Sequence, residues 1–191
     1  ISTMYKELYS LTYDKNDEVT VTCGAQEAIC STLNALIGPG DEVLIFEPFY
    51  CLYVDVIKSL GATPKFIRLS GNNFEFSIND LESQITSKTK LMILNTPHNP
   101  TGKVFTMQEL ENISQLIQKH QIIVLSDEVY EHYTYEDHKH IPMAPVKGMK
   151  DHVITISSLG KTFGITGWKI GYICAPKSLS GLIRESRGQF I

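Results

Sequence analysis

Lys161 lies in the segment ISSLGKTFGITGWK (156–169), where its neighbours allow two kinds of chemistry. A Gly-Lys-Thr triplet can hold the phosphates of a nucleotide. A lysine amine can also form a covalent bond with a carbonyl carbon. A lysine between two glycines can equally be an ordinary exposed side chain, so the rest of the sequence has to separate these three interpretations.

The nucleotide interpretation requires the full pattern Gly-x-x-x-x-Gly-Lys-Ser/Thr. Five residues before Gly160 stands Thr155, inside a predicted strand, so the first glycine is missing. The lysine should also open a helix, but Gly164 and Gly167 follow it closely. The sequence therefore argues against an ATP- or GTP-hydrolysing enzyme.

Seven short apolar or β-branched runs predict the strands that would position Lys161. They are residues 19–22, 42–46, 65–69, 91–95, 122–126, 153–157 and 169–175. Helical patterns separate most of them, notably at 25–37 and at 106–120, which begins with the capping-box pattern Thr106-x-x-Glu109. This alternation predicts an α/β fold with a mostly parallel seven-stranded sheet and helices on both faces. The last two strands lack a helix between them and are expected to pair antiparallel.

Polar clusters follow five of these strands at the end where open α/β sheets bind ligands. The clusters are residues 23–26, 47–50, 95–102, 127–130 and 157–161. Each has a structural explanation when taken alone: Asp127 could cap a strand, Tyr50 and Tyr130 could pack, and Asn99-Pro100-Thr101-Gly102 is a good turn. Their recurrence at successive strand ends predicts one shared site.

Composition limits the remaining classes of function. The 191 residues are 42% apolar and 20% charged, with a net charge of −4, as expected for a soluble globular domain. That charge argues against binding to nucleic acid or to a membrane surface, and no apolar run is long enough to span a bilayer. The four cysteines are scattered, which argues against a metal site. Three of them lie in largely apolar segments, where we expect buried reduced thiols and hence a reducing compartment, most simply the cytoplasm.

Four motifs together resemble the active-site signatures of the class I aminotransferases, which are fold-type-I pyridoxal-phosphate enzymes. They are Asn99-Pro100-Thr101-Gly102, Asp127-x-x-Tyr130, Ser158-x-x-Lys161 and Gly167-x-Lys169-x-Gly171. Within that family, the stretches EPFY, HNPTGKVF and TGWKIGY look most like the kynurenine, glutamine and methionine aminotransferases. The resemblance covers essentially the whole chain.

The resemblance implies three catalytic residues, Lys161, Asp127 and Tyr130. Lys161 would form a Schiff base with the aldehyde of pyridoxal 5′-phosphate and later move a proton from the substrate Cα. Asp127 would pair with the pyridinium nitrogen and keep the ring protonated. Tyr130 and Asn99 would hydrogen-bond the phenolic oxygen of the cofactor.

The same resemblance assigns residues to the cofactor's phosphate and ring. Backbone N–H groups at a helix start, a hydroxyl, a lysine and a stacking aromatic would hold them, namely Gly24, Ala25, Gln26, Ser158, Lys169 and Tyr50. Many relatives have arginine at the position of Lys169, so here a lysine ammonium, which is a point charge, replaces a guanidinium that could bind the phosphate through two N–H groups. Cys23 stands where some relatives have a hydroxyl, which leaves that contact open.

The resemblance also implies parts beyond these residues. An arginine that binds the substrate carboxylate belongs to a small C-terminal domain, and a tyrosine from the second subunit of a homodimer lies upstream of Ile1. We therefore expect residues 1–191 to be the cofactor-binding large domain, with the small domain missing or incomplete, and to be unable to complete a cycle of transamination alone. The final stretch RESRGQFI is expected to be mid-helix.

Two other functions use the same residues. A carbon–sulfur β-lyase acting on cysteine conjugates would use the same lysine, and an aminotransferase-like module could bind without catalysis. Substrates would be an amino acid and a 2-oxo acid, and Phe49, Tyr50 and Tyr133 are compatible with bulky or apolar amino donors. His132, His138 and His140 are expected to be solvated rather than metal ligands.

Overall fold

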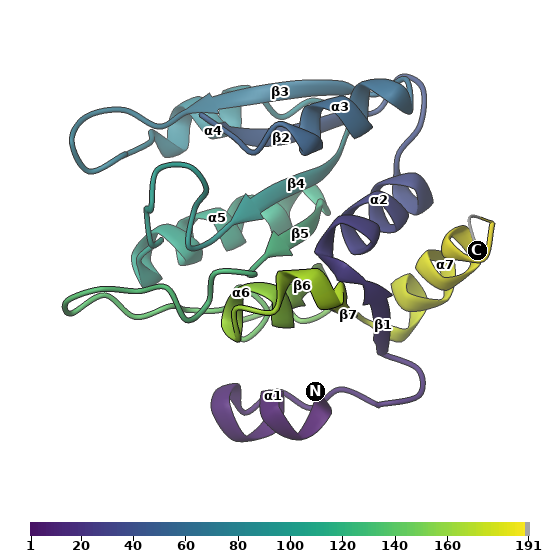
Figure 1. Ribbon diagram of the computed structural model, residues 1–191. Helices are drawn as coiled ribbons and strands as arrows, with labels where there is room; N and C mark the ends of the chain where they lie inside the picture. The colour runs from purple at the N-terminus through teal and green to yellow at the C-terminus, as the bar shows by residue number, and fades with distance from the viewer. Residues whose placement is uncertain (190–191) are drawn as a thin grey trace.

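The computed structural model describes residues 1–189, which form a three-layer α/β fold around one seven-stranded sheet (Figure 1). The strands are β1 (Val19–Cys23), β2 (Glu42–Glu47), β3 (Thr63–Arg68), β4 (Thr89–Asn95), β5 (Ile123–Asp127), β6 (Val153–Ser158) and β7 (Ile170–Cys174). The helices are α1 (Ser2–Tyr9), α2 (Gly24–Leu36), α3 (Leu52–Ser59), α4 (Ile78–Ser83), α5 (Met107–His120), α6 (Leu159–Thr162), a 3₁₀ turn at Thr166–Trp168 and α7 (Lys177–Arg187). All seven predicted strands are confirmed, with small shifts at their ends.

The strand order in the sheet is β1-β7-β6-β5-β4-β2-β3. β7 runs antiparallel to both of its neighbours, and the other four pairings are parallel. The predicted antiparallel step from β6 to β7 is therefore confirmed. Because every strand except β7 points the same way, the carboxyl ends of β1, β4, β5 and β6 meet at one edge of the sheet.

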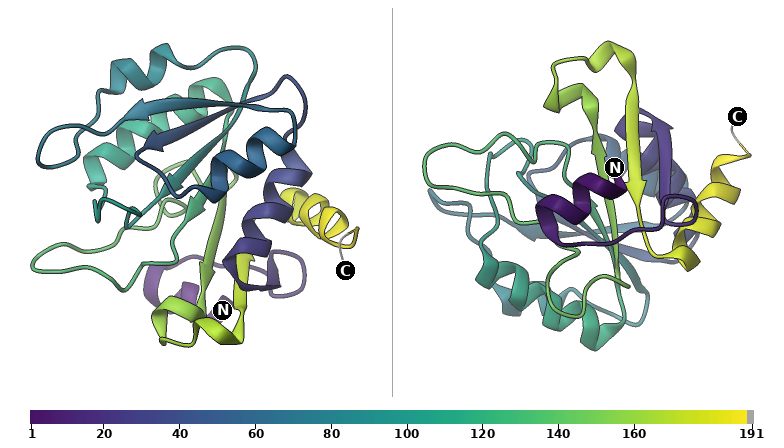
Figure 2. Two further views of the ribbon diagram at one scale, coloured as in Figure 1. Left: turned by 45° about the horizontal axis from the view of Figure 1, so that its top comes forward. Right: turned by 90° about the horizontal axis from the view of Figure 1, so that it is seen from below.

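Alternation along the strands divides the core into two apolar layers. Leu44 and Phe46 of β2 point to the face covered by α1, α4 and α5, while Val43 and Ile45 point to the face covered by α2, α3 and α7. Figure 2 shows helices on both sides of the sheet, with α1 on the side away from α2. Both faces are buried, which explains why the strands are nearly continuous in apolar residues.

A local sequence signal accounts for the start of α5. Thr106 accepts a hydrogen bond from the Glu109 N–H while the Glu109 side chain accepts one from the Thr106 N–H, which confirms the predicted capping box of α5. α2 begins at Gly24, one residue before the predicted start. The C-terminal α7 ends at Arg187, and residues 190–191 lie outside the described residues.

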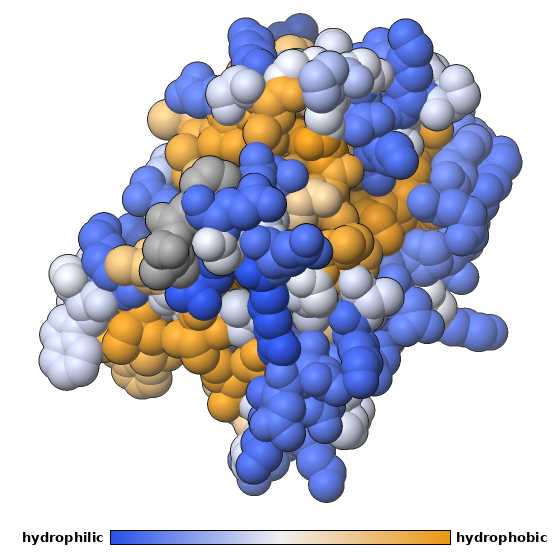
Figure 3. Space-filling model, turned by 90° about the vertical axis from the view of Figure 1, so that its right-hand side faces the viewer, coloured by the Kyte–Doolittle hydropathy of each residue, from blue (hydrophilic) through white to orange (hydrophobic). Residues whose placement is uncertain are grey.

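Figure 3 shows the side of the molecule that carries α7, where hydrophobic side chains are visible between hydrophilic ones.

A buried polar cluster anchors the long segment after β5. Glu128 is fully buried, and its carboxylate accepts hydrogen bonds from the Ser126 hydroxyl at 2.7 Å and the Met143 N–H at 3.2 Å. His140 lies 3.0 Å from the same carboxylate, and its side chain is only 3% exposed. The expectation that His140 is solvated is therefore wrong. The contact with the buried Glu128 carboxylate, twelve positions earlier in the chain, holds this histidine in the core.

Cysteine burial also differs from expectation. Cys174 on β7 is buried, but Cys23 and Cys51 are exposed and Cys30 is partly exposed; all four are free thiols. Cys23 is the last residue of β1 and Cys51 directly precedes α3, so both are exposed at a helix start at the edge of the sheet. No helix among residues 1–189 is long and apolar enough to cross a membrane.

β7 and the first turn of α2 lie unusually close together at Gly171. Gly171 pairs with Thr22 across the antiparallel ladder, and a Cβ built on it would lie 2.4 Å from the carbonyl carbon of Gly24 and 2.7 Å from the nitrogen of Ala25. Only glycine fits here without moving the backbone. Gly171 therefore sets the position at which α2 begins.

We expect Gly171→Ala to lower the free energy of unfolding by about 1–3 kcal/mol, because the added methyl overpacks a backbone contact. Gly181→Ala in α7 is the matched control, since a Cβ there meets nothing within 4 Å. It is expected to stabilise the protein by about 0.5–1 kcal/mol through helix propensity. Urea denaturation of both variants measures the difference, and equal stability would contradict the close contact.

We expect His140→Ala to lower the free energy of unfolding by about 3 kcal/mol, because it leaves the buried Glu128 carboxylate without its partner. His138→Ala in the same segment changes an exposed side chain and is expected to shift stability by less than about 0.5 kcal/mol. Denaturant titration at one pH compares the two. Equal effects from both variants would show that the buried pair is not important for folding.

Candidate active site

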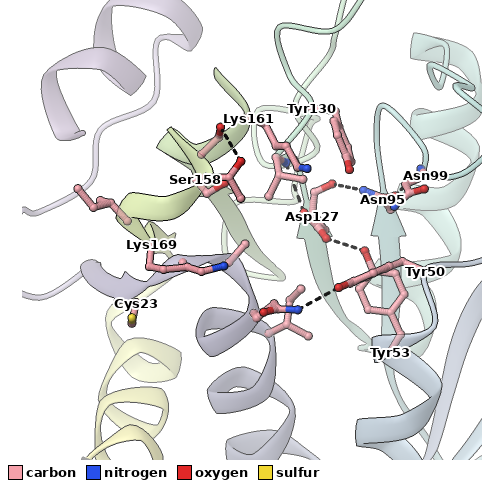
Figure 4. A pocket seen from close by; sticks show the side chains of 18 residues that line it. Cys23, Tyr50, Tyr53, Asn95, Asn99, Asp127, Tyr130, Ser158, Lys161 and Lys169 are labelled. Atoms are coloured by element: carbon pink, nitrogen blue, oxygen red, sulfur yellow. Dashed lines mark hydrogen bonds between the residues drawn. The ribbon is translucent and has the colours of Figure 1, made fainter. Parts of the chain in front are cut away.

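A cavity of about 280 Å³ opens at the edge where the parallel strands end, between the starts of α2 and α6 (Figure 4). All ten residues that the sequence assigned to catalysis or cofactor binding line it: Gly24, Ala25, Gln26, Tyr50, Asn99, Asp127, Tyr130, Ser158, Lys161 and Lys169. They come from segments far apart in the sequence. The predicted meeting of polar clusters in one place is therefore confirmed, although their chemical roles are a separate matter.

One end of the cavity is suited to an anion. The N–H groups of the first turn of α2 point outward without helical partners, and Gly24 opens that turn with φ of 79°, which glycine adopts readily. Lys169 lies beside Gly24 and is itself held in the left-handed region with φ of 53°. Ser158, at the N-terminus of α6, adds a hydroxyl. A helix start, a cation and a hydroxyl together form a ready site for phosphate.

The other end is formed by the buried carboxylate of Asp127, the last residue of β5. Asp127 is 4% exposed. Tyr53 donates a hydrogen bond to Oδ2 at 2.5 Å, and the Val129 N–H donates to Oδ1 at 3.3 Å. Burial raises the pKa of Asp127, the hydrogen bonds from Tyr53 and Val129 lower it, and the negative charge of Glu128 raises it, which together give a pKa of about 6. Among residues 1–189 the carboxylate has no ion-pair partner.

Lys161 lies in the four-residue helix α6 and points into the cavity toward Tyr130 (Figure 4). Its Nζ lies 5.6 Å from the centroid of the Tyr130 ring, close enough for a cation–π contact. The Tyr133 hydroxyl donates to the Lys161 carbonyl at 2.9 Å, and the rings of Tyr130 and Tyr133 meet edge to face. Tyr133, in the segment after β5, thus holds the backbone of Lys161 in place.

Two further hydrogen bonds order the walls. Asn95 donates from Nδ2 to the Asp127 carbonyl at 2.9 Å and accepts from the Asn99 N–H at 2.7 Å, so it ties the turn after β4 to the end of β5. Gln26 donates from Nε2 to the Tyr50 hydroxyl at 3.0 Å, which links α2 to the aromatic side of the cavity. These contacts therefore hold the walls of the cavity together.

Sequence reasoning missed Tyr53 and Asn95. Tyr53 follows Tyr50 at helical spacing, which was a signal that both could face one site, and Asn95 is the polar residue that ends an apolar strand. Phe49 is not part of the cavity wall, because it stacks on Phe66 with the ring centroids 5.3 Å apart. Phe49 therefore does not support the expectation of bulky or apolar amino donors.

Two alternative sites find no support in the described part of the chain. Residues 1–189 contain no group of three His, Cys, Asp or Glu side chains placed to hold a metal ion. Thr155 lies within β6, where the first glycine of a nucleotide-binding loop would have to be, and α6 is too short to act as the helix of such a loop. The covalent role of Lys161 stays a prediction, and the structure places this lysine in the cavity beside Tyr130.

The raised pKa of Asp127 predicts a specific pH dependence of stability. In the unfolded chain this carboxyl ionises near pH 4, but in the fold it ionises only near pH 6, so its contribution to stability is full below pH 4 and is lost as the pH rises through 6. We expect this loss to be about 3 kcal/mol. Asp127→Asn should remove that loss, while Asp151→Asn, at an exposed site, should keep it. Urea titrations between pH 4 and 7 measure both, and an unchanged pH profile in Asp127→Asn would contradict the assignment.

Comparison with known sequences identifies relatives of the whole described region. The profile of the family "Aminotransferase class I and II" matches residues 2–191. Kynurenine–oxoglutarate transaminase 3 of Rattus norvegicus is 43% identical over 189 residues, covering 94% of this chain and 42% of the relative. The chain therefore spans about two fifths of the length of this curated relative.

Solved structures agree. A protein of Escherichia coli described as having a methionine aminotransferase function superposes with a TM-score of 0.96 at 34% identity, covering 99% of this chain and 50% of that one. The N-succinyldiaminopimelate aminotransferase of Mycobacterium tuberculosis gives a TM-score of 0.95 at 37% identity, with the same coverage. Sequence motifs, sheet order and the cavity at the strand ends thus converge with these likenesses: the chain belongs to the class I and II aminotransferase family.

Proposed function

We propose that residues 1–191 form the cofactor-binding large domain of a pyridoxal-phosphate-dependent aminotransferase, which moves an amino group between an amino acid and a 2-oxo acid. The observation that carries this proposal is the meeting of Lys161, the buried Asp127 and the start of α2 around one cavity. Each of these is common alone. Together they match the three separate needs of one cofactor: an amine, an acid for its ring and an anion site.

The donor set at the α2 end fits the phosphate group of that cofactor. The N–H groups of Gly24, Ala25 and Gln26 would bind its oxygens, Ser158 would donate a hydroxyl, and Lys169 would supply positive charge. The left-handed backbone of Lys169 is unusual for a residue with a side chain and supports a functional reason for its placement. This end would fix the orientation of the cofactor.

The opposite end fits a protonated heteroaromatic ring. Asp127 is a buried carboxylate that has hydrogen bonds but no ion-pair partner within residues 1–189, and a ring N–H⁺ would supply the opposite charge. Tyr50 lies beside the cavity where its ring could stack on the cofactor, and Asn99 and Tyr130 would donate hydrogen bonds to its phenolic oxygen. When bound, pyridoxal phosphate supplies an aldehyde that bonds amines and a ring that accepts the electrons left at the substrate Cα.

Lys161 is the amine that would bond the aldehyde carbon of the cofactor. As a free amine, Lys161 would act as the base that takes the proton from the substrate Cα. Tyr133 holds the Lys161 carbonyl, so the backbone stays in place while the side chain moves. The chain's own residues thus provide binding, orientation and proton transfer.

Substrates and assembly follow from the family. The substrate class is an amino acid with a 2-oxo acid as its counterpart, and the enzyme acts as a homodimer because class I aminotransferases build each active site from two subunits. The coverage of relatives supports the domain assignment, because this chain matches about half of each solved structure named above. The remaining half of such enzymes supplies the group that binds the substrate carboxylate.

Lys161→Ala tests the proposal directly. We expect the purified chain mixed with pyridoxal phosphate to develop a visible absorbance band, and borohydride to leave a covalent mass increase on the peptide that contains Lys161. The Lys161→Ala variant should show neither, because no amine remains at that position. Absorbance spectroscopy and peptide mass spectrometry are the two measurements.

Lys177→Ala is the matched control, since Lys177 is an exposed lysine far from the cavity that pairs with Asp17. It is expected to label like the unmodified chain. A covalent label on another lysine, or a folded protein in which Lys161 stays unlabelled, would overturn the proposal.

A further inference from the structure

Tyr53 has no role among the motifs, yet it makes the shortest contact to the buried acid. It lies in the first turn of α3 with 2% of its surface exposed, and its hydroxyl donates to Oδ2 of Asp127 at 2.5 Å. It is the one side chain among residues 1–189 that hydrogen-bonds this carboxylate, since the other donor is the backbone N–H of Val129. Figure 4 shows the ring reaching from α3 toward Asp127.

We propose that Tyr53 is a positioning residue for Asp127: its hydroxyl fixes the orientation of the carboxylate and keeps it ionised toward the cavity. With Tyr53 on one oxygen and Val129 on the other, rotation of the carboxylate would break a hydrogen bond. This inference rests on the proposed function, in which Asp127 faces a protonated ring. The contact itself is independent of any bound group.

Tyr53 is well held for this task. Its ring meets that of Tyr50 edge to face at 5.6 Å, and it packs in the apolar layer with Val54 and Ile57. Burial and the adjacent Asp127 charge raise the pKa of Tyr53 well above its usual range, so the phenol keeps its proton and remains a donor. A fixed neutral donor favours the ionised form of its acceptor.

The electrostatic surroundings explain why Asp127 needs such a donor. Burial and the charge of Glu128, the next residue after β5, both favour the protonated acid, and a protonated acid cannot neutralise a cationic ring. On the cavity side, Lys161 of α6 and Tyr130 of the following turn face the same space. Tyr53 is the side chain from the covering helix layer that acts in the opposite direction to burial.

Tyr53→Phe tests this role because it removes the hydroxyl and keeps the ring. Tyr5→Phe is the matched control: Tyr5 is also fully buried, lies on the opposite face of the sheet, and its hydroxyl has no hydrogen-bond partner within the described residues. Both variants lose one buried oxygen from a tyrosine. Only one of them touches Asp127.

The measurement is a ¹³C NMR titration of the aspartate carboxyl groups in the chain without added cofactor, with the Asp127 signal assigned by its loss in Asp127→Asn. We expect Tyr53→Phe to raise the pKa of Asp127 by about one unit, a tenfold change in its dissociation constant. Tyr5→Phe should leave it unchanged. An unchanged Asp127 titration in folded Tyr53→Phe would overturn the proposal.

A second measurement covers the case in which Tyr53→Phe does not fold. Replacement of all tyrosines by 3-fluorotyrosine makes the phenol a stronger donor, so the pKa of Asp127 should fall, and no shift would contradict the role. Labelling of Lys161 by pyridoxal phosphate and borohydride is read separately. If Lys161 is not labelled but the pKa of Asp127 shifts, the proposed function is rejected and the positioning role of Tyr53 stands. If Lys161 is labelled but the pKa of Asp127 does not shift, only the positioning role of Tyr53 is rejected.

Discussion

The site depends on a single electrostatic constraint: a carboxylate buried at the end of a central strand, with no ion-pair partner among the described residues. Burying an ionised carboxylate is costly unless hydrogen bonds or an opposite charge compensate for it. Asp127 has the Tyr53 hydroxyl and the Val129 N–H, which lower its pKa, but burial still raises that pKa to about 6. The two hydrogen bonds thus offset only part of the cost of burying this acid. In the proposed function, the cationic ring of the cofactor would supply the remaining compensation.

Sheet topology provides the setting for this acid. β5 lies between β4 and β6 in the sheet, so Asp127 is flanked by the turn that carries Asn99 and by the helix that carries Lys161. Parallel neighbours are necessary, because only parallel strands bring their carboxyl ends to the same edge. The antiparallel β7 contributes differently: its Gly171 allows the start of α2 to approach closely, so the N–H groups of the first turn of α2 line the same cavity as Asp127.

Strand alternation separates two adjacent acids into different roles. Asp127 faces the cavity, while Ser126 and Glu128 take part in a buried cluster with His140 that anchors the segment leading to β6. The two carboxylates still interact, because Glu128 contributes to the raised pKa of Asp127. Structural and functional acids thus stand side by side, and only the direction of each side chain distinguishes them.

The sequence by itself determined the features that are set locally. Apolar runs predict the seven strands, and the Thr106–Glu109 pair predicts the capping box of α5. The lack of a long helical pattern before β7 predicts its antiparallel pairing, and the structure places only the short α6 and a 3₁₀ turn there. The ten residues that line the cavity were also accessible, because each belongs to a motif at a strand end. Only the tertiary structure decided the pairs that are distant in the chain. Tyr53 meets Asp127 across 74 positions, and Asn95 reaches the Asp127 carbonyl across 32. His140 is buried against Glu128, and Phe49 stacks on Phe66 instead of lining the cavity. Both placements result from packing between elements, which no local sequence pattern encodes.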